Sequence, residues 1–293
     1  MKKIKNNLLL LLTALIWGGA FVAQSTSMDY IGPWTFTCIR CLLAGIALIV
    51  ALPLISKITN TSSNSNNVDT LKGGLACGFI LAPATLFQQI GILYTTVGKA
   101  GFITALYCII VPFLSIFLKK KVSLQTWIAA IISLTGFYFL SLSNGIESIS
   151  IGDIYLLLSS FFFAIHILVV DYFSPKANGI KMSAIQFITV GVLTFIPMLI
   201  IEKPQIFRIK QAIIPILYAG LLSNSLGYTF QIIGQRGADP TVATLILSLE
   251  SVFSAIGGFL LLHEVLTTKE LLGCLLVFIG VILAQIKING RDF

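Results

Sequence analysis

Charged residues are scarce in this chain. They make up only 10% of its 293 residues, whereas hydrophobic residues make up 57% and the mean hydropathy is +0.98. A soluble domain carries about 25% charged residues, so folding alone could not keep this much apolar surface away from water. The composition therefore excludes an ordinary soluble domain. It predicts an all-α membrane protein whose main partner is the lipid bilayer.

The motifs that typically carry enzyme chemistry are also missing. The sequence has no G-x-x-x-x-G-K-[ST] loop and no G-x-G-x-x-G after a strand, and the segment HEVLT lacks the second His of H-E-x-x-H. We therefore expect no catalytic residue, no cofactor, no metal site and no transport powered by the chain's own ATP hydrolysis. Cys38 and Cys41 form a C-x-x-C inside an apolar run, where small residues on a helix face are the simplest interpretation.

The net charge of +8 does not indicate a nucleic-acid partner, because the basic residues fall mostly between apolar runs and form no basic face. With a cytoplasmic N-terminus, thirteen Lys and Arg lie in cytoplasmic segments and five in outer ones, while Arg40 lies within the membrane. The positive-inside rule then predicts a multi-pass plasma-membrane protein with both termini in the cytoplasm. We interpret the N-terminal run as a membrane helix, not as a cleaved signal peptide.

Ten apolar runs are each long enough to cross a bilayer, which takes about 20 residues. Breaks that contain Pro, Gly, Asn or charged residues separate them. The ten runs lie near 8–28, 34–55, 72–93, 99–118, 124–143, 152–172, 182–201, 211–233, 240–262 and 270–288.

The sequence contains an internal repeat. A shift of 143 residues places FQQIGILYTTVGKAGFITALYCI (87–109) over FQIIGQRGADPTVATLILSLESV (230–252), which matches Gln88 with Gln231 and Tyr107 with Glu250. Because each half holds five helices, an odd number, the second half enters the membrane in the opposite orientation. Inverted repeats of this kind are typical of transporters that bind substrate near the midplane. We therefore predict two inverted five-helix repeats, at 8–143 and 152–288, around a central cavity.

Several segments resemble the EamA family of the drug/metabolite transporter superfamily. They are ALIWGGAFV (14–22), FTCIRCLLAG (36–45), GKAGFITALYCIIVPF (98–113), LTGFYF (134–139), DPTVATLILSLESVFSAIGGFLLLHE (239–264) and VFIGVIL (277–283). The resemblance covers nearly the whole chain and implies ten helices in two inverted repeats. It implies a central cavity lined mainly by helices 1, 3, 4, 6, 8 and 9, with the fifth and tenth helices peripheral.

The resemblance also implies a carrier of amino acids, other small metabolites, sugar derivatives or drugs, often directed outward. One departure from the family pattern concerns the acid that often follows the fourth helix. Glu264 stands at the matching point after the ninth helix, but the first half has KKK (119–121) there. A requirement for this acid in both halves is therefore in doubt.

Glu250 is the outstanding candidate for the site, because a charge near the bilayer centre costs about 2.5–3.5 kcal/mol on insertion scales. It could bind a substrate ammonium or carry a proton, and the alternative is a protonated acid bonded between helices. Tyr107, its repeat partner, could bind a ligand or simply pack. Trp17, beside Gly18 and Gly19 at mid-helix, suggests a cavity wall or a close helix crossing.

The other candidates are polar residues within apolar runs, and each has a structural alternative as a hydrogen-bonding residue between helices. His166 could carry protons. Arg40 could snorkel, grip a substrate carboxylate or pair with Asp29, and we favour the pairing. The complete set of predicted substrate-binding residues is Trp17, Gln88, Tyr107, His166, Asn224, Gln231 and Glu250.

These patterns favour a secondary transporter of small organic solutes that works by alternating access, an exporter of amino acids or related metabolites. The alternative is a membrane-embedded enzyme that acts on lipid-linked substrates, for which the connecting segments are short and poor in clustered acids, His or Arg. The sequence leaves the oligomeric state open.

Overall fold

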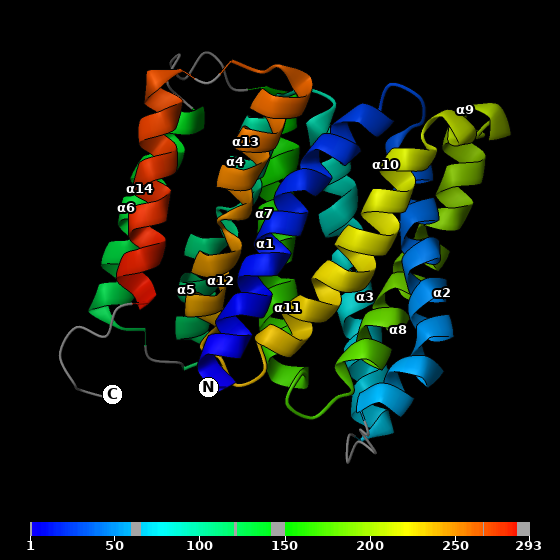
Figure 1. Ribbon diagram of the computed structural model, residues 1–293, viewed down its shortest axis with the longest axis horizontal. Helices are drawn as coiled ribbons and strands as arrows, with labels where there is room; N and C mark the ends of the chain where they lie inside the picture. The colour runs from blue at the N-terminus through cyan, green and yellow to red at the C-terminus, as the bar shows by residue number, and fades with distance from the viewer. Residues whose placement is uncertain (1, 60–65, 120–121, 142–149, 266, 286–293) are drawn as a thin grey trace.

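The computed structural model describes residues 2–59, 66–119, 122–141, 150–265 and 267–285, and the elements within them are helical (Figure 1). The first half contains α1 (Lys2–Ser27), α2 (Pro33–Thr59), α3 (Asn67–Ile92), α4 (Val97–Thr104), α5 (Tyr107–Phe117) and α6 (Leu124–Ser141). The second half contains α7 (Ile151–Phe173), α8 (Gly179–Pro197), η2 (Met198–Glu202), α9 (Ile206–Gln211), α10 (Ile213–Leu217), η3 (Tyr218–Gly227), α11 (Tyr228–Gly234), α12 (Pro240–Leu247), α13 (Glu250–Leu262) and α14 (Thr268–Gln285).

Eight segments of the described chain are long and apolar enough to cross a membrane. The predicted fifth and tenth spans correspond to α6 and α14, whose apolar parts, Leu124–Gly136 and Leu271–Gly280, are shorter. Residues 142–143 and 286–288 of the predicted ranges lie outside the described residues. The structure therefore confirms a multi-helix membrane protein and supports eight of the ten predicted spans by length and composition.

Large apolar side chains cover the outside of the bundle. Val50 is 73% exposed, Phe79 59% and Ile196 64%. Such a surface would be unfavourable in water and matches the hydrocarbon of a bilayer, where every backbone polar group must be satisfied within the protein. This requirement explains why the described spans are helical.

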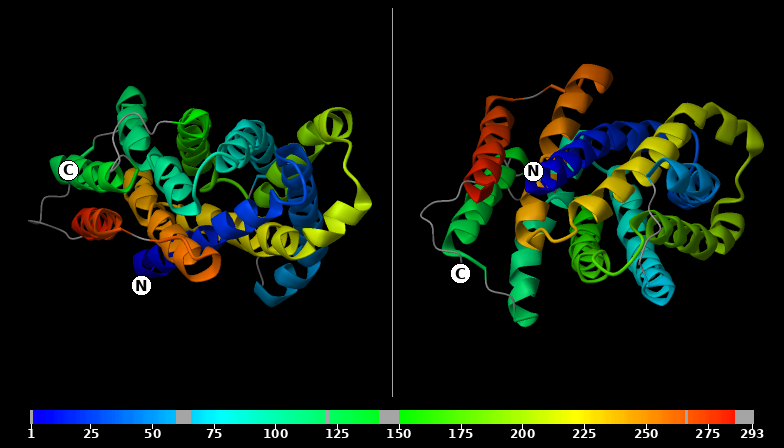
Figure 2. Two further views of the ribbon diagram at one scale, coloured as in Figure 1. Left: turned by 90° about the horizontal axis from the view of Figure 1, so that it is seen from above. Right: turned by 60° about the horizontal axis from the view of Figure 1, so that its bottom comes forward.

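The two halves interleave in the bundle. Helix α1 packs against α12 and α13, while α7 packs against α4 and α5. Two contacts join helices that occupy the same place in the two halves, α2 with α8 and α6 with α14. Figures 1 and 2 show the α6–α14 pair at one edge of the bundle, which is the peripheral position that the family resemblance implies.

The predicted shift of 143 residues relates the observed elements as well as the sequence. It carries Val97–Thr104 (α4) onto Pro240–Leu247 (α12), and it carries the start of α5 at Tyr107 onto the start of α13 at Glu250. The fourth and ninth predicted spans are therefore both interrupted, at equivalent points. Neither interruption was expected, because no Pro or Gly lies at 105–106 or 248–249.

Each interruption is a tight turn inside the protein. The Cys108 N–H donates to Ala105 O at 3.0 Å, and the Ser251 N–H donates to Ser248 O at 3.1 Å. These bonds span three residues and not four, which winds the helix more tightly at this point. The helix that follows the turn begins at Tyr107 in one half and at Glu250 in the other.

Acidic side chains of the second half bind helix starts of the first half at the upper end of the bundle in Figure 1. Glu264 accepts hydrogen bonds from the N–H groups of Val97 (2.9 Å) and Gly98 (3.3 Å), at the start of α4. Glu202 accepts from Trp34 N (2.9 Å) and from Thr35 N (2.8 Å), at the start of α2. Carboxylates are stabilising there because free N–H groups and the positive helix dipole lie together.

Replacing Glu264 by Ala should lower the free energy of unfolding by about 1 kcal/mol, the usual cost of losing a side-chain cap. Glu264→Gln should cost less, since the amide oxygen still accepts a hydrogen bond. The measurement is denaturant unfolding in detergent micelles, with Asp29→Ala as the control because Asp29 is an exposed acid between α1 and α2. Equal losses for Glu264→Ala and Asp29→Ala would contradict the capping role.

Candidate functional site

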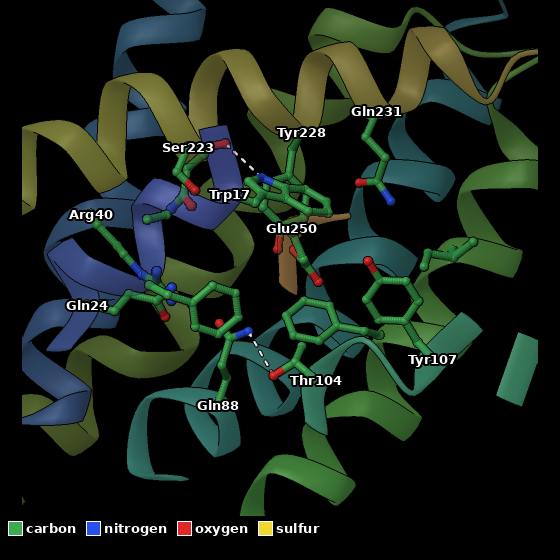
Figure 3. A pocket seen from close by; sticks show the side chains of 15 residues that line it. Trp17, Gln24, Arg40, Gln88, Thr104, Tyr107, Ser223, Tyr228, Gln231 and Glu250 are labelled. Carbon is green, nitrogen blue, oxygen red and sulfur yellow. Dashed lines mark hydrogen bonds between the residues drawn. The ribbon is translucent and has the colours of Figure 1, made fainter. Parts of the chain in front are cut away.

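A small pocket, with a volume of about 30 Å³, lies in the interior of the bundle, between the two interrupted spans (Figure 3). None of its lining residues is more than 8% exposed, so the pocket lies deep in the bundle. The lining residues are Trp17, Ala20, Phe21, Gln24, Arg40, Gln88, Thr104, Tyr107, Phe163, Ile167, Ser223, Asn224, Tyr228, Gln231 and Glu250.

The lining reflects the internal repeat. Helices of both halves contribute to it, and more than half of its members form pairs that are 143 residues apart. The pocket therefore lies where equivalent positions of the two halves face each other. The four pairs are Ala20 with Phe163, Gln24 with Ile167, Gln88 with Gln231 and Tyr107 with Glu250.

Glu250 and Tyr107, which the repeat matched in the sequence, meet in this pocket. Figure 3 shows the Tyr107 hydroxyl directed toward the Glu250 carboxylate. Glu250 is 3% exposed and Tyr107 1% exposed, and neither Tyr107 Oη nor Glu250 Oε1 has a hydrogen-bond partner in the protein. Buried polar atoms normally have partners, so two unpartnered oxygens that face each other across one pocket are unusual.

Trp17 forms part of the pocket wall. Its ring lies against Tyr228, with centroids 4.6 Å apart, and its Nε1 donates to Ser223 O at 3.4 Å. The neighbouring Gly18 lies so close to α13 that an added Cβ would collide with Phe253. The cavity wall and the close helix crossing, which were alternatives in the sequence, are therefore both present.

The π-helix η3 brings further polar groups to the pocket, and π-helical turns often occur at functional sites. Asn224 lines the pocket, and its Nδ2 lies 3.5 Å from Cys41 Sγ. Gln88 also lines it and donates weakly to Thr104 Oγ1 at 3.5 Å. Gln231 lines it with an Oε1 that has no hydrogen-bond partner in the protein.

His166 is not among the pocket-lining residues. Its ring lies behind Tyr228, with centroids 5.8 Å apart, and its Nε2 forms a 3.1 Å hydrogen bond with Gln186 Oε1 on α8. The side chain is fully buried. This geometry is that of a histidine that joins two helices, which was the structural alternative in the sequence.

Arg40 corrects one of our expectations. The favoured pairing with Asp29 does not form, because Asp29 is exposed near the start of α2 whereas Arg40 is 2% exposed and turned into the pocket. Among the described residues, the ion pair present is Lys99–Asp153, at 2.8 Å. The guanidinium lies 5.0 Å from the centre of the Phe36 ring.

Sequence reasoning missed several lining residues. Gln24 was overlooked, although 17, 20, 21 and 24 have the spacing of one helix face and all four residues line the pocket. Tyr228 was also overlooked, and it follows Asn224 by four residues and precedes Gln231 by three. Spacing from the chosen candidates could have found both residues. Thr104 carries no such signal.

No three His, Cys, Asp or Glu side chains come together as a possible metal site in the part of the chain that the structure describes. The polar groups of the pocket are instead amides, hydroxyls, one carboxylate and one guanidinium, set among aromatic rings. Such a mixture can surround a small organic molecule and hydrogen-bond its polar groups.

The chain is similar to several proteins described as transporters. A protein of Archaeoglobus fulgidus, named an uncharacterized transporter, is 27% identical over 98% of this chain and 88% of its own length. The uncharacterized transporter YoaV of Bacillus subtilis is 24% identical, with coverage of 94% and 95%. One solved crystal structure superposes with a TM-score of 0.75 over 95% of this chain and 96% of the other, at 15% identity, and so shares the fold.

The sequence profile of the EamA-like transporter family matches the chain twice, over residues 4–142 and 150–285. The two matches together cover nearly the whole chain. With the transporter relatives, they establish a multi-pass membrane protein of the transporter class. The chain belongs to the EamA-like transporter family.

Proposed function

We propose that this protein is a secondary transporter that exports small organic solutes, amino acids or related metabolites, from the cell. The observation that carries the proposal is the buried pocket between two helix interruptions that are equivalent in the two halves. Carriers built from two inverted repeats typically bind their substrate near the midplane, at the boundary of the repeats.

Alternating access would follow from the way the halves contact each other. Polar groups join the two halves at both ends of the bundle. At the upper end, Glu264 binds the start of α4. At the lower end, Arg236 accepts a hydrogen bond at its carbonyl from Asn6 Nδ2 (3.1 Å), and Thr70 Oγ1 accepts one from Asn178 N (3.0 Å). If the hydrogen bonds at one end broke while those at the other end remained, the pocket would open to one side of the membrane at a time.

The charge distribution supports an orientation for this cycle. With most Lys and Arg in the cytoplasm, the upper end faces outward and both termini lie in the cytoplasm of a plasma-membrane protein. In agreement with that arrangement, α1 begins and α14 ends toward the lower end in Figure 1. The solute would enter the pocket from the lower end and leave at the end where Glu264 binds α4.

Counterflow in proteoliposomes tests the proposal. Vesicles that contain the purified protein and are preloaded with an unlabelled amino acid should accumulate the labelled form, and empty vesicles should not. Ala20→Phe should abolish counterflow, because the new ring would fill the pocket that Ala20 lines. Leu15→Phe is the matched control, since Leu15 on the same helix is 50% exposed toward lipid and should tolerate the change.

Two outcomes would contradict the proposal. One is the absence of counterflow across a broad panel of metabolites, together with turnover of a lipid-linked substrate, which would support an embedded enzyme. The other is counterflow that Ala20→Phe leaves unchanged in folded protein, which would place the transport route elsewhere.

A further inference from the structure

Arg40 carries a buried charge that no group of the described protein neutralises. It lies in the membrane span Pro33–Pro53, and its Nε and Nη2 have no hydrogen-bond partner in the protein. An arginine in the centre of a bilayer is costly, and such residues normally pair with an acid or with carbonyl groups. Removing a guanidinium from water without a partner is among the more expensive arrangements in a fold.

Glu250 lies in the same pocket without contacting Arg40. Among the described residues, the structure shows no ion pair between these two side chains. Figure 3 shows Arg40 and Tyr107 on opposite sides of Glu250, with aromatic rings nearby. The pocket therefore presents a cationic group and an acidic group at separate points, and each has atoms free to bind a ligand.

We infer that the pocket binds a zwitterion, with its carboxylate at Arg40 and its ammonium at Glu250. A guanidinium binds a carboxylate through two parallel N–H donors, and the unpartnered Nε and Nη2 are two such donors. This inference rests on the proposed function, because it takes the pocket as the transport site. Beyond the proposed function, the inference specifies which charges the ligand carries and which end of the ligand binds Arg40 and which binds Glu250.

Neutral groups complete the two ends of this site. Gln24 lies beside Arg40 in Figure 3, and its Oε1 has no hydrogen-bond partner in the protein. The Tyr107 hydroxyl and Gln231 Oε1 are likewise unpartnered, and the hydroxyl points toward Glu250. Oxygen acceptors beside a carboxylate suit the several N–H donors of an ammonium group. The rings of Trp17 and Tyr228 leave an aromatic surface for an apolar side chain.

Three probes of equal shape test the charge pattern. Phenylalanine carries both charges, phenylalaninamide only the positive charge and phenyllactate only the negative one. Each competes with labelled phenylalanine for counterflow. For the wild-type protein, phenylalanine should compete at concentrations about tenfold lower than either analogue, because each analogue leaves one buried charge unpaired.

The variants should remove these preferences separately. With Arg40→Gln, phenylalanine and phenylalaninamide should compete equally, while the preference over phenyllactate remains. With Glu250→Gln, phenylalanine and phenyllactate should compete equally. Arg208→Gln is the matched control, because Arg208 is an exposed arginine on α9 and its loss should leave the pattern unchanged. If Arg40→Gln does not fold, Arg40→Lys should keep a weakened preference for the carboxylate.

Three results would overturn the inference. They are a wild-type protein that prefers an analogue over phenylalanine, an Arg40 variant that weakens all three probes equally, and counterflow limited to solutes that are not zwitterions. In the first two cases counterflow of phenylalanine persists, so the proposed function stands while the inference fails. Counterflow limited to other solutes would overturn the inference together with the amino-acid part of the proposed function. Absence of counterflow for every solute would instead overturn both.

Discussion

The structure depends on the requirement that backbone groups within lipid find partners inside the protein. A continuous helix satisfies this requirement by its own hydrogen bonds. An interrupted helix satisfies it only where other helices bury the interruption. Both interruptions here, after Thr104 and after Leu247, lie inside the bundle and keep their hydrogen bonds through tight turns. A shift of 143 residues relates them, so the same solution occurs once in each half.

The same requirement determines where polar side chains lie, because a membrane protein tolerates them only where they face its interior or one another. The pocket gathers several that have no complete set of partners, including Arg40, Tyr107 and Glu250. Unsatisfied groups of this kind lower stability, which favours a role in binding over a role in folding. By contrast, Glu264 and Glu202 are paired with helix starts and stabilise the contact between the halves.

Much of the fold could be predicted from the sequence. The length of the apolar runs and the 143-residue repeat each depend on many residues, so a change at any single position does not hide them. The same repeat matched Tyr107 with Glu250 in the sequence, and both residues line the pocket. The rotation of each helix was harder to predict. Arg40 faces the pocket and not Asp29, and His166 lies behind Tyr228. Both placements depend on which side of a helix packs against its neighbours, and the sequence alone does not determine that. The interruptions carried no Pro or Gly signal and result from tertiary packing.

The central claim is that this pocket opens to each side of the membrane in turn. A cysteine introduced at Ser223, which lines the pocket, tests it through its reaction with a membrane-impermeant maleimide added to either side. The background is low, since four of the five native cysteines are buried and Cys274 is partly so. The account predicts reaction from both sides, slowed by a transported solute. A cysteine that reacts from neither side, while counterflow continues, would contradict it.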